Sequence, residues 1–128
     1  PTTNRLEVEG DASKTVASAW LANSDRRIKK DIVSLCSMEN ETEALEVIDQ
    51  LRPVKFKYND DFREKHPSIQ NIDYYNFIAQ EFQNVFPNSV TETKEGLLQI
   101  DSYPANIYSI AAIQELHQIV KKQDATLT

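Results

Sequence analysis

The sequence feature that most constrains the fold is a change of hydrophobic period at Pro53. Residues 42–51 place apolar side chains three residues apart and crowd acidic side chains into the first turns, which predicts a helix that ends before the proline. Asn40 or Thr42 can cap this helix. Residues 54–58, VKFKY, alternate apolar side chains with lysines, which is the period of a half-buried strand. A helix followed directly by a strand indicates a mixed α and β fold.

The next part of the chain predicts a loop, a second strand and a short helix. Residues 59–68, NDDFREKHPS, are polar and indicate a loop. Residues 74–78 predict a strand that passes into a helix containing Phe82 and Val85. Pro87 stops that helix because proline cannot continue the backbone hydrogen bonding. We therefore expect short elements through the middle of the chain.

Each of the two glycines marks a turn. Residues 89–101, SVTETKEGLLQID, resemble a hairpin that turns near Glu95 and Gly96. Residues 5–22 begin with alternating apolar and acidic side chains, break at Gly10, and continue with small and β-branched residues, which predicts extended structure around a turn. Two glycines cannot build a glycine-rich phosphate loop, so no nucleotide site is predicted.

The segment 25–35 fits either a helix or a strand. Ile28, Ile32 and Leu35 would align on one face of a helix. Val33, beside a serine, leaves a strand open. The pattern does not decide between them.

The end of the chain, residues 106–128, predicts a long helix by propensity. Two registers of an apolar stripe fit it. The first register fills heptad a and d positions with Ile113, Leu116, Val120 and Leu127. The second register uses Ile110, Ile113, His117 and Val120. Either stripe packs on the domain's own sheet or in a bundle between chains, and the pattern alone leaves both open.

Length and charge bound the classes of partner. The chain has 128 residues, enough for one domain with a modest core. It carries 14 basic against 20 acidic side chains and a formal charge of −6, a field that repels phosphate backbones and anionic lipid. No apolar run of 18 residues and no signal peptide pattern are present. We expect no nucleic acid and no membrane partner, and we expect the chain, which begins with proline, to be a piece of a longer cytosolic protein.

No metal or cofactor is predicted. His66 and His117 are isolated from one another and from Cys36, and no pair has the spacing of metal ligands. Cys36 is the single cysteine and has apolar neighbours, which is typical of a small buried side chain. The core must therefore form without disulfides.

Ser24 is followed by the charged run DRRIKK. A serine hydroxyl attacks an amide only with a base, and a lysine serves as that base when desolvation or neighbouring cations lower its pKa. The run supplies such cations, among them Arg26, Arg27 and Lys30. Serines beside charged runs are also common in surface loops, so these residues alone fit a surface hydroxyl as well as a nucleophile.

Four stretches, in order, match one known family: SDRRIKKDI (24–32), ALEVIDQLRPVKFKY (44–58), FIAQEFQNVFPNSV (77–90) and YSIAAIQELHQIV (108–120). They resemble the C-terminal intramolecular chaperone domain of bacteriophage tail fibres, tailspikes and neck appendages, the self-cleaving S74 peptidase family. The chain is also similar to the cleavage domain of the membrane-anchored myelin regulatory factors. Residues 5–12, RLEVEGDA, resemble the β-rich stalk ends that precede such domains.

The resemblance implies a homotrimer that helps an upstream fibre or appendage of the same chain to fold and then cuts itself off. It implies that Ser24 is the nucleophile and that the bond between Asn23 and Ser24 is cut. The family places its lysine five positions after the serine, which selects Lys29, although Lys30 stands next to it. We expect no cofactor, action in the infected host cytoplasm during virion assembly, and absence from the mature virion after cleavage.

The spacing of Ser24 and Lys29 makes a geometric demand. In a regular helix they would point about 140° apart, and in a strand they would lie on opposite faces about 16 Å distant. The chain must therefore bend near residues 25–27, or the lysine must come from a neighbouring subunit.

The expected fold is a small α+β domain over residues 24–128, with short strands, a hairpin, one mid-chain helix and a long C-terminal helix. Residues 1–23 are expected to be the end of a β-rich stalk. Asp25 is expected either to cap a following helix and pair with an arginine, or to hold the lysine. Gln80 and Glu81 belong to a family block, and a structural hydrogen bond is expected of them.

Two other functions fit the same sequence. One is an uncut trimerisation or host-binding tip, in which Ser24 is a loop residue. The other is a regulatory cleavage domain that frees an upstream DNA-binding region, as in the membrane-anchored transcription factors. The identity of the sequence before Pro1 would distinguish a regulatory cleavage domain from a chaperone of a phage fibre.

Overall fold

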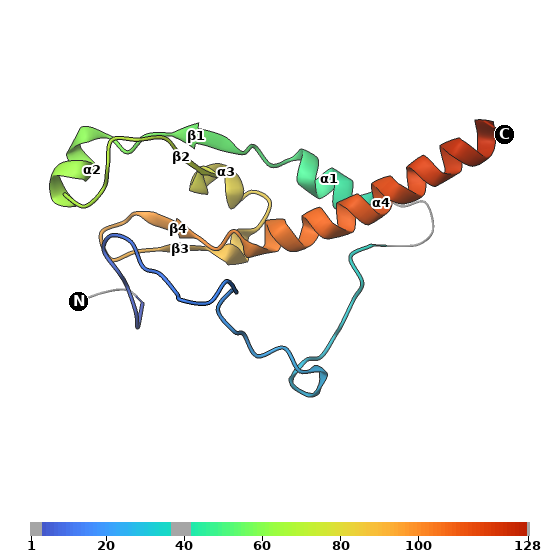
Figure 1. The fold of residues 1–128 in the computed structure, drawn as a ribbon, viewed down its shortest axis with the longest axis horizontal. Coiled ribbons are helices and arrows are strands. Elements are labelled where there is room, and N and C mark those ends of the chain that lie inside the picture. Colours follow the sequence, from blue (N-terminus) through green and yellow to red (C-terminus); the bar gives the residue numbers. More distant parts are fainter. Residues whose placement is uncertain (1–3, 37–41, 128) are drawn as a thin grey trace.

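The computed structural model describes residues 4–36 and 42–127. Figure 1 shows a long C-terminal helix at one end of the molecule and an N-terminal segment that runs along the outside. The described strands form two sheets of two strands each. The elements in order are η1 (Arg26–Ile28), α1 (Glu43–Asp49), β1 (Val54–Phe56), α2 (Asp60–Lys65), β2 (Tyr74–Asn76), α3 (Ala79–Phe82), η2 (Pro87–Ser89), β3 (Val90–Glu92), β4 (Leu98–Ile100) and α4 (Tyr103–Leu127). The expected small α+β fold is confirmed.

The core lies between α1 and α4. Its buried centre is made of small side chains, Ala44 from α1 with Ala111 and Ala112 from α4. Alanines let two helices approach closely, since the interaxial distance depends on the side chains at the contact. Partly buried side chains close the edges of this cluster: Leu35, Cys36, Leu45, Ile48 and Tyr108. Cys36, predicted to be a small buried side chain, is half-buried and packs against this cluster.

A buried carboxylate joins the same two helices. Glu115 of α4 is 1% exposed. Its Oε2 accepts a hydrogen bond from the backbone N–H of Ala44 at 3.1 Å, and its Oε1 accepts one from Leu45 at 3.0 Å. These donors lie in the first turn of α1, where backbone N–H groups have no partner within their own helix. Glu115 therefore caps a helix that is 70 residues away in sequence.

The predicted helix over 42–51 is confirmed, but its predicted capping is not. Thr42 occupies the N-cap position without a side-chain hydrogen bond to the backbone. Its hydroxyl donates to Glu46 Oε1 at 3.1 Å instead. Asn40, the other expected cap, lies outside the described residues. The long-range carboxylate replaces the local cap that the sequence suggested.

The polar loop predicted over 59–68 is wrong, because α2 forms there. Asn59 caps it, with its Oδ1 accepting from the backbone N–H of Phe62 at 2.9 Å. Acidic side chains fill the first turn and basic ones the last, which complements the helix dipole. The Phe62 ring also stacks on Tyr58 with centroids 5.4 Å apart. The cap, the dipole and the ring contact together stabilise a helix in a segment whose polar composition is typical of a loop.

The strands predicted over 54–58 and 74–78 both form, although each is shorter than predicted, and they pair as the first sheet. β1 and β2 run antiparallel, with Lys55 opposite Tyr75 and Phe56 opposite Tyr74. Side chains along residues 54–58 alternate between half-buried and exposed, as the sequence pattern predicted.

A row of aromatic rings then connects β2 and α3 to α4. The ring centroid of the buried Phe82 of α3 lies 5.0 Å from that of Phe77 and 5.2 Å from that of Phe86. The ring centroids of Phe86 and Tyr108 of α4 lie 5.4 Å apart. Val85, expected in the helix, lies beyond α3.

The hairpin is confirmed as β3 and β4, antiparallel and joined by a turn in which Gly96 has φ of +82°. Pro87 was expected to stop the preceding helix, but α3 already ends at Phe82, and the proline instead opens the 3-10 turn η2. Proline fits the first turn of a helix because its missing N–H would have no partner there.

The terminal helix α4 begins at Tyr103, three residues before the sequence predicted. Asp101 Oδ1 accepts from the backbone N–H of Tyr103 at 3.0 Å and fixes this start. The apolar stripe is exposed, with Ile113, Leu116 and Val120 at 65%, 50% and 46%. Of the two alternatives that the sequence left open for the stripe, packing on the domain's own sheet is not observed, because the alanine face with Glu115 is buried instead.

The N-terminal segment is mostly irregular. Within the described residues 4–25 there is no helix or strand, so the expected β-rich structure is not formed in this chain alone. The expected turn at Gly10 is present, with φ of +93°. The segment 25–35, open between helix and strand, forms one 3-10 turn, η1. Asp31, at φ of +55°, interrupts any longer helix there.

The buried cap makes a stability prediction. Replacing Glu115 by alanine leaves two first-turn N–H groups without partners, so we expect the free energy of unfolding to fall by about 2–4 kcal/mol. Glu115→Gln keeps an acceptor oxygen and is expected to lose less. Gln114→Ala, an exposed neighbour on the same helix, is the matched control. Urea unfolding followed by circular dichroism, at one protein concentration, measures all three. Equal stability of the Glu115→Ala and Gln114→Ala proteins would refute the capping role.

Candidate active site

The structure brings Ser24 and Lys29 together within one chain. The Lys29 Nζ donates a hydrogen bond to Ser24 Oγ at 2.6 Å. Among the described residues, Lys30 forms no hydrogen bond or ion pair, so the geometry selects Lys29 of the two adjacent lysines. A lysine of a neighbouring subunit is not needed to form the pair.

The bend that the spacing demanded is the 3-10 turn η1. Ile28 N–H donates to the Asp25 carbonyl and Lys29 N–H donates to the Arg26 carbonyl, both at 3.1 Å. The residues on either side of the turn, Asp25 and Lys29, have extended backbones. Two extended residues are therefore joined by a turn, which brings the side chains of Ser24 and Lys29 within hydrogen-bond distance.

Asp25 holds this turn. Its Oδ1 accepts from the backbone N–H of Arg27 at 2.8 Å, and its two oxygens accept from Nε and Nη2 of the Arg27 side chain at 2.9–3.2 Å. The side-chain bond from Arg27, followed by the backbone bond, lowers the pKa of the Asp25 carboxyl from its usual range. Asp25 thus makes the capping and pairing contacts, and its carboxylate is occupied by Arg27.

The site is open in a single chain. Ser24 and Lys29 are both exposed, and so are the large apolar side chains around them. These are Trp20, Leu21, Ile28, Ile32 and Val33. Burial is one of the two effects that favour the neutral form of a lysine, the form that takes a proton from serine. Any surface that covers this pair must come from outside the described chain.

A second serine and lysine pair, missed by the sequence reasoning, lies before the first. Lys14 Nζ donates to Ser18 Oγ at 3.1 Å and also to the carbonyls of Ser18 and Ala19 at 3.1 and 2.9 Å. It also lies 5.2 Å from the Trp20 ring centroid. The three contacts all lie within residues 14–19, so this pair closes a short loop. The i and i+4 spacing of the two residues was the available signal.

The family block around α3 has a structural part. Glu81 forms a bidentate pair with Arg52, with Oε1 to Nε at 2.9 Å and Oε2 to Nη2 at 2.6 Å. The pair lowers the pKa of the Glu81 carboxyl and raises the pKa of Arg52. It ties α3 to the segment between α1 and β1. Gln80 is exposed and makes no side-chain hydrogen bond within the part of the chain that is described.

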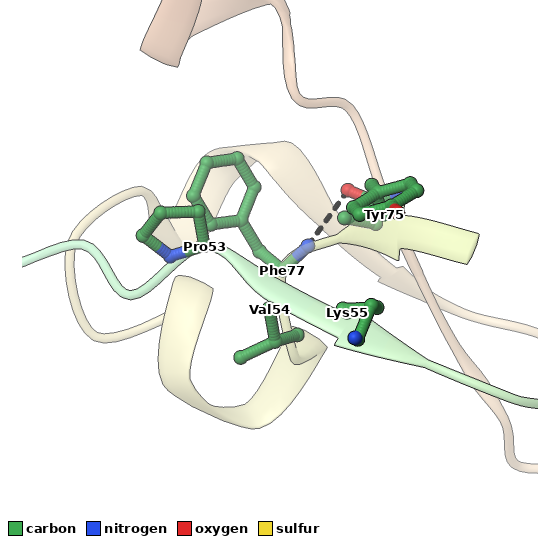
Figure 2. A pocket seen from close by; sticks show the side chains of 6 residues that line it. Pro53, Val54, Lys55, Tyr75 and Phe77 are labelled. Atoms are coloured by element: carbon green, nitrogen blue, oxygen red, sulfur yellow. Dashed lines mark hydrogen bonds between the residues drawn. The ribbon is translucent and has the colours of Figure 1, made fainter. Parts of the chain in front are cut away.

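An apolar groove of about 480 Å³ lies on the β1–β2 sheet, on the other side of the molecule from the Ser24 segment (Figures 1 and 2). Its lining residues are Pro53, Val54, Lys55, Tyr75, Asn76 and Phe77. Figure 2 shows Phe77 held by its backbone N–H, which donates to Asn76 Oδ1 at 2.8 Å. Neither Ser24 nor Lys29 lines this groove, so it is separate from the candidate site.

In residues 4–36 and 42–127 no group of histidine, cysteine and acidic side chains is arranged to hold a metal ion. Within the same residues, no helix has both the length and the apolar character to cross a membrane.

Comparison with known proteins gives one positive finding. No curated protein sequence matched the chain. A family model described as Peptidase S74, chaperone of endosialidase, matches residues 24–91. The match begins at Ser24, contains Lys29 and runs through the first residues of β3, without reaching α4. Because it covers more than half of the 128 residues, the chain belongs to the peptidase S74 family, the chaperone of endosialidase.

Proposed function

We propose that this chain is a trimerising intramolecular chaperone that assists the folding of an upstream phage fibre or appendage and then releases itself by cutting between Asn23 and Ser24. The observation that carries the proposal is the 2.6 Å hydrogen bond from Lys29 to Ser24, formed at the first residue of the family match. Residues 24–128 act as the chaperone unit, and residues 1–23 are the end of the upstream part. The work is done in the infected host cytoplasm during virion assembly, and the released unit is absent from the virion.

Self-cleavage proceeds in two steps. Neutral Lys29 takes the proton from Ser24 Oγ, which attacks the carbonyl carbon of Asn23 and forms a C–O bond. The C–N bond to the Ser24 nitrogen breaks, and Lys29 returns the proton to that departing amine. Water then hydrolyses the ester, which leaves a carboxylate on Asn23 and restores the Ser24 hydroxyl. The reaction needs no cofactor.

The exposed face of α4 supports assembly into a trimer. The apolar stripe of α4 (Ile110, Ile113, Leu116 and Val120) faces solvent in a single chain. Burying a continuous apolar stripe against partner helices is the usual way in which such a face is stabilised. A fibre of intertwined strands has many contacts between residues far apart in sequence. Three chains that are already joined begin folding in register, which lowers the entropic cost of nucleation.

A second function is favoured by one observation, the exposure of both Ser24 and Lys29. A pair that is never covered would stay uncut, and the chain would then be a permanent trimerisation or host-binding tip. Intact mass separates the two functions.

The first prediction concerns the nucleophile and the base. We expect the full chain to split between Asn23 and Ser24, and Ser24→Ala and Lys29→Met to cut at least about 100-fold more slowly, because each removes one partner of the proton transfer. Lys30→Met is expected to cut, since Lys30 has no bond to Ser24. Mass spectrometry under denaturing conditions reads all four proteins. A whole wild-type chain in a folded trimer would favour the uncut tip.

The second prediction concerns the origin of the lysine. Because the dyad closes within one chain, co-expressed Ser24→Ala and Lys29→Ala chains are expected to form mixed trimers that never cut. Wild-type chains co-expressed with either variant are the control, and only the wild-type chains should split. Homotrimers of the Lys29→Ala chain are expected to stay uncut whether the lysine acts within one chain or between chains. Cleavage in the mixed variant trimers would show that a lysine acts across subunits.

The third prediction concerns the trimer. Ile113→Asp with Val120→Asp places two charges on the stripe and is expected to turn the trimer into a monomer. Leu97→Asp, an equally exposed apolar position on the hairpin at 53%, is the matched control and is expected to stay trimeric. Sedimentation equilibrium gives the mass of each. A trimeric double variant would show that the α4 stripe is not the assembly surface.

A further inference from the structure

The turn that forms the dyad has little to hold it. It contains three residues, none of them buried, and its backbone is closed by two hydrogen bonds of 3.1 Å. Short 3-10 turns have poorer hydrogen-bond geometry than α-helices, and exposed backbone bonds open readily. If the turn opens, positions 24 and 29 separate by up to about 16 Å in an extended chain. Something else must keep the turn closed while the serine attacks.

The Asp25 carboxylate is placed to do this. It binds both the backbone N–H and the side chain of the same residue, Arg27. The backbone bond is that of an N-cap, which fixes the first turn of a helix. The guanidinium meets the carboxylate as a fork with two parallel bonds, a geometry that lysine cannot reproduce. The carboxylate and the guanidinium together form a clasp around η1.

We propose that Asp25, held by Arg27, is a positioning residue of the self-cleavage reaction: the clasp keeps η1 closed and so holds Lys29 Nζ within hydrogen-bond distance of Ser24 Oγ. This inference rests on the proposed function. Asp25 touches neither reacting atom, so its effect passes through the turn.

The clasp has a second effect on the base. A free carboxylate beside Lys29 would attract its ammonium and draw it away from Ser24. Arg27 occupies both oxygens of Asp25, so the lysine remains with the serine. The side-chain hydrogen bond from Arg27 also lowers the pKa of the Asp25 carboxyl, so the clasp stays charged at neutral and alkaline pH.

The test separates the cap from the charge. Asp25→Ala removes both, Asp25→Asn keeps the cap, and Arg27→Gln keeps the cap but loses the fork. Asp11→Ala and Arg5→Gln, exposed positions upstream, are controls matched in charge change. The rate of splitting of the full chain is followed after pulse-labelled cell-free synthesis, from pH 6 to 10.

We expect Asp25→Ala to cut about tenfold more slowly at the plateau, with the midpoint of the pH profile unchanged. Asp25→Asn should recover to within about threefold of the wild type, and Arg27→Gln should lie between them. A wild-type rate for Asp25→Ala overturns the proposal. So does a midpoint moved by about a pH unit or more, because the carboxylate would then act on the lysine's charge. An Asp25→Asn chain as slow as Asp25→Ala overturns the cap.

A second measurement does not depend on cleavage. In the uncut Ser24→Ala chain, backbone chemical shifts of residues 26–28 report whether the turn is formed. We expect Asp25→Ala to lose the turn signature and Asp25→Asn to keep it. If the wild type does not cut, the proposed function fails, and these shifts still decide whether the clasp holds the turn. An unchanged turn in the Asp25→Ala chain overturns the positioning role on its own.

Discussion

The contact on which the rest of the structure depends is the carboxylate of Glu115 at the start of α1. Removing a charge from water is costly, and two backbone N–H groups at the positive end of a helix offset that cost. Glu115 reaches both donors only when α4 lies at one position along α1. Ala111 and Ala112 then permit the close approach that brings the carboxylate into reach. One buried acid thus sets the register of the two helices that form the core.

This register also decides which face of α4 is left over. The helix carries two kinds of apolar surface, small side chains around Glu115 and large ones along Ile113, Leu116 and Val120. Only the small face admits α1 at a distance where the carboxylate reaches its donors. The large face remains exposed, although by sequence it is the more hydrophobic of the two. The sequence could not predict this choice, because a lone glutamate in a helix pattern indicates a solvated position until its partner, about 70 residues away, is known.

Local signals predicted the local structure well. The change of period at Pro53 predicted α1 and β1, and Gly96 predicted the hairpin turn, because each depends on residues near in sequence. α2 was not predicted, because the polar composition of residues 59–68 is typical of a loop, although Asn59 and the acids after it are also a capping signature. For the site, the resemblance identified Ser24 and Lys29, and the need for a bend between them followed from helix and strand geometry. The identity of the bend, a 3-10 turn clasped by Asp25, depends on side-chain contacts that spacing does not reveal.

The local nature of the dyad has a consequence for the timing of the proposed reaction. Ser24 and Lys29 are joined by a turn within six residues, and loops of this length close in less than a microsecond. Subunit assembly takes milliseconds to minutes. A dyad whose chemistry was also faster than assembly would remove the chaperone before the upstream chains had met. Under the proposed function, closing the turn is therefore necessary but not sufficient for cleavage. The further condition is that the exposed Ser24 and Lys29 side chains become buried. Under the same proposal, assembly would supply that condition by burying the exposed apolar residues near the dyad in sequence, Trp20, Leu21 and Ile28, against a neighbouring chain, because loss of water favours the neutral lysine that the reaction requires.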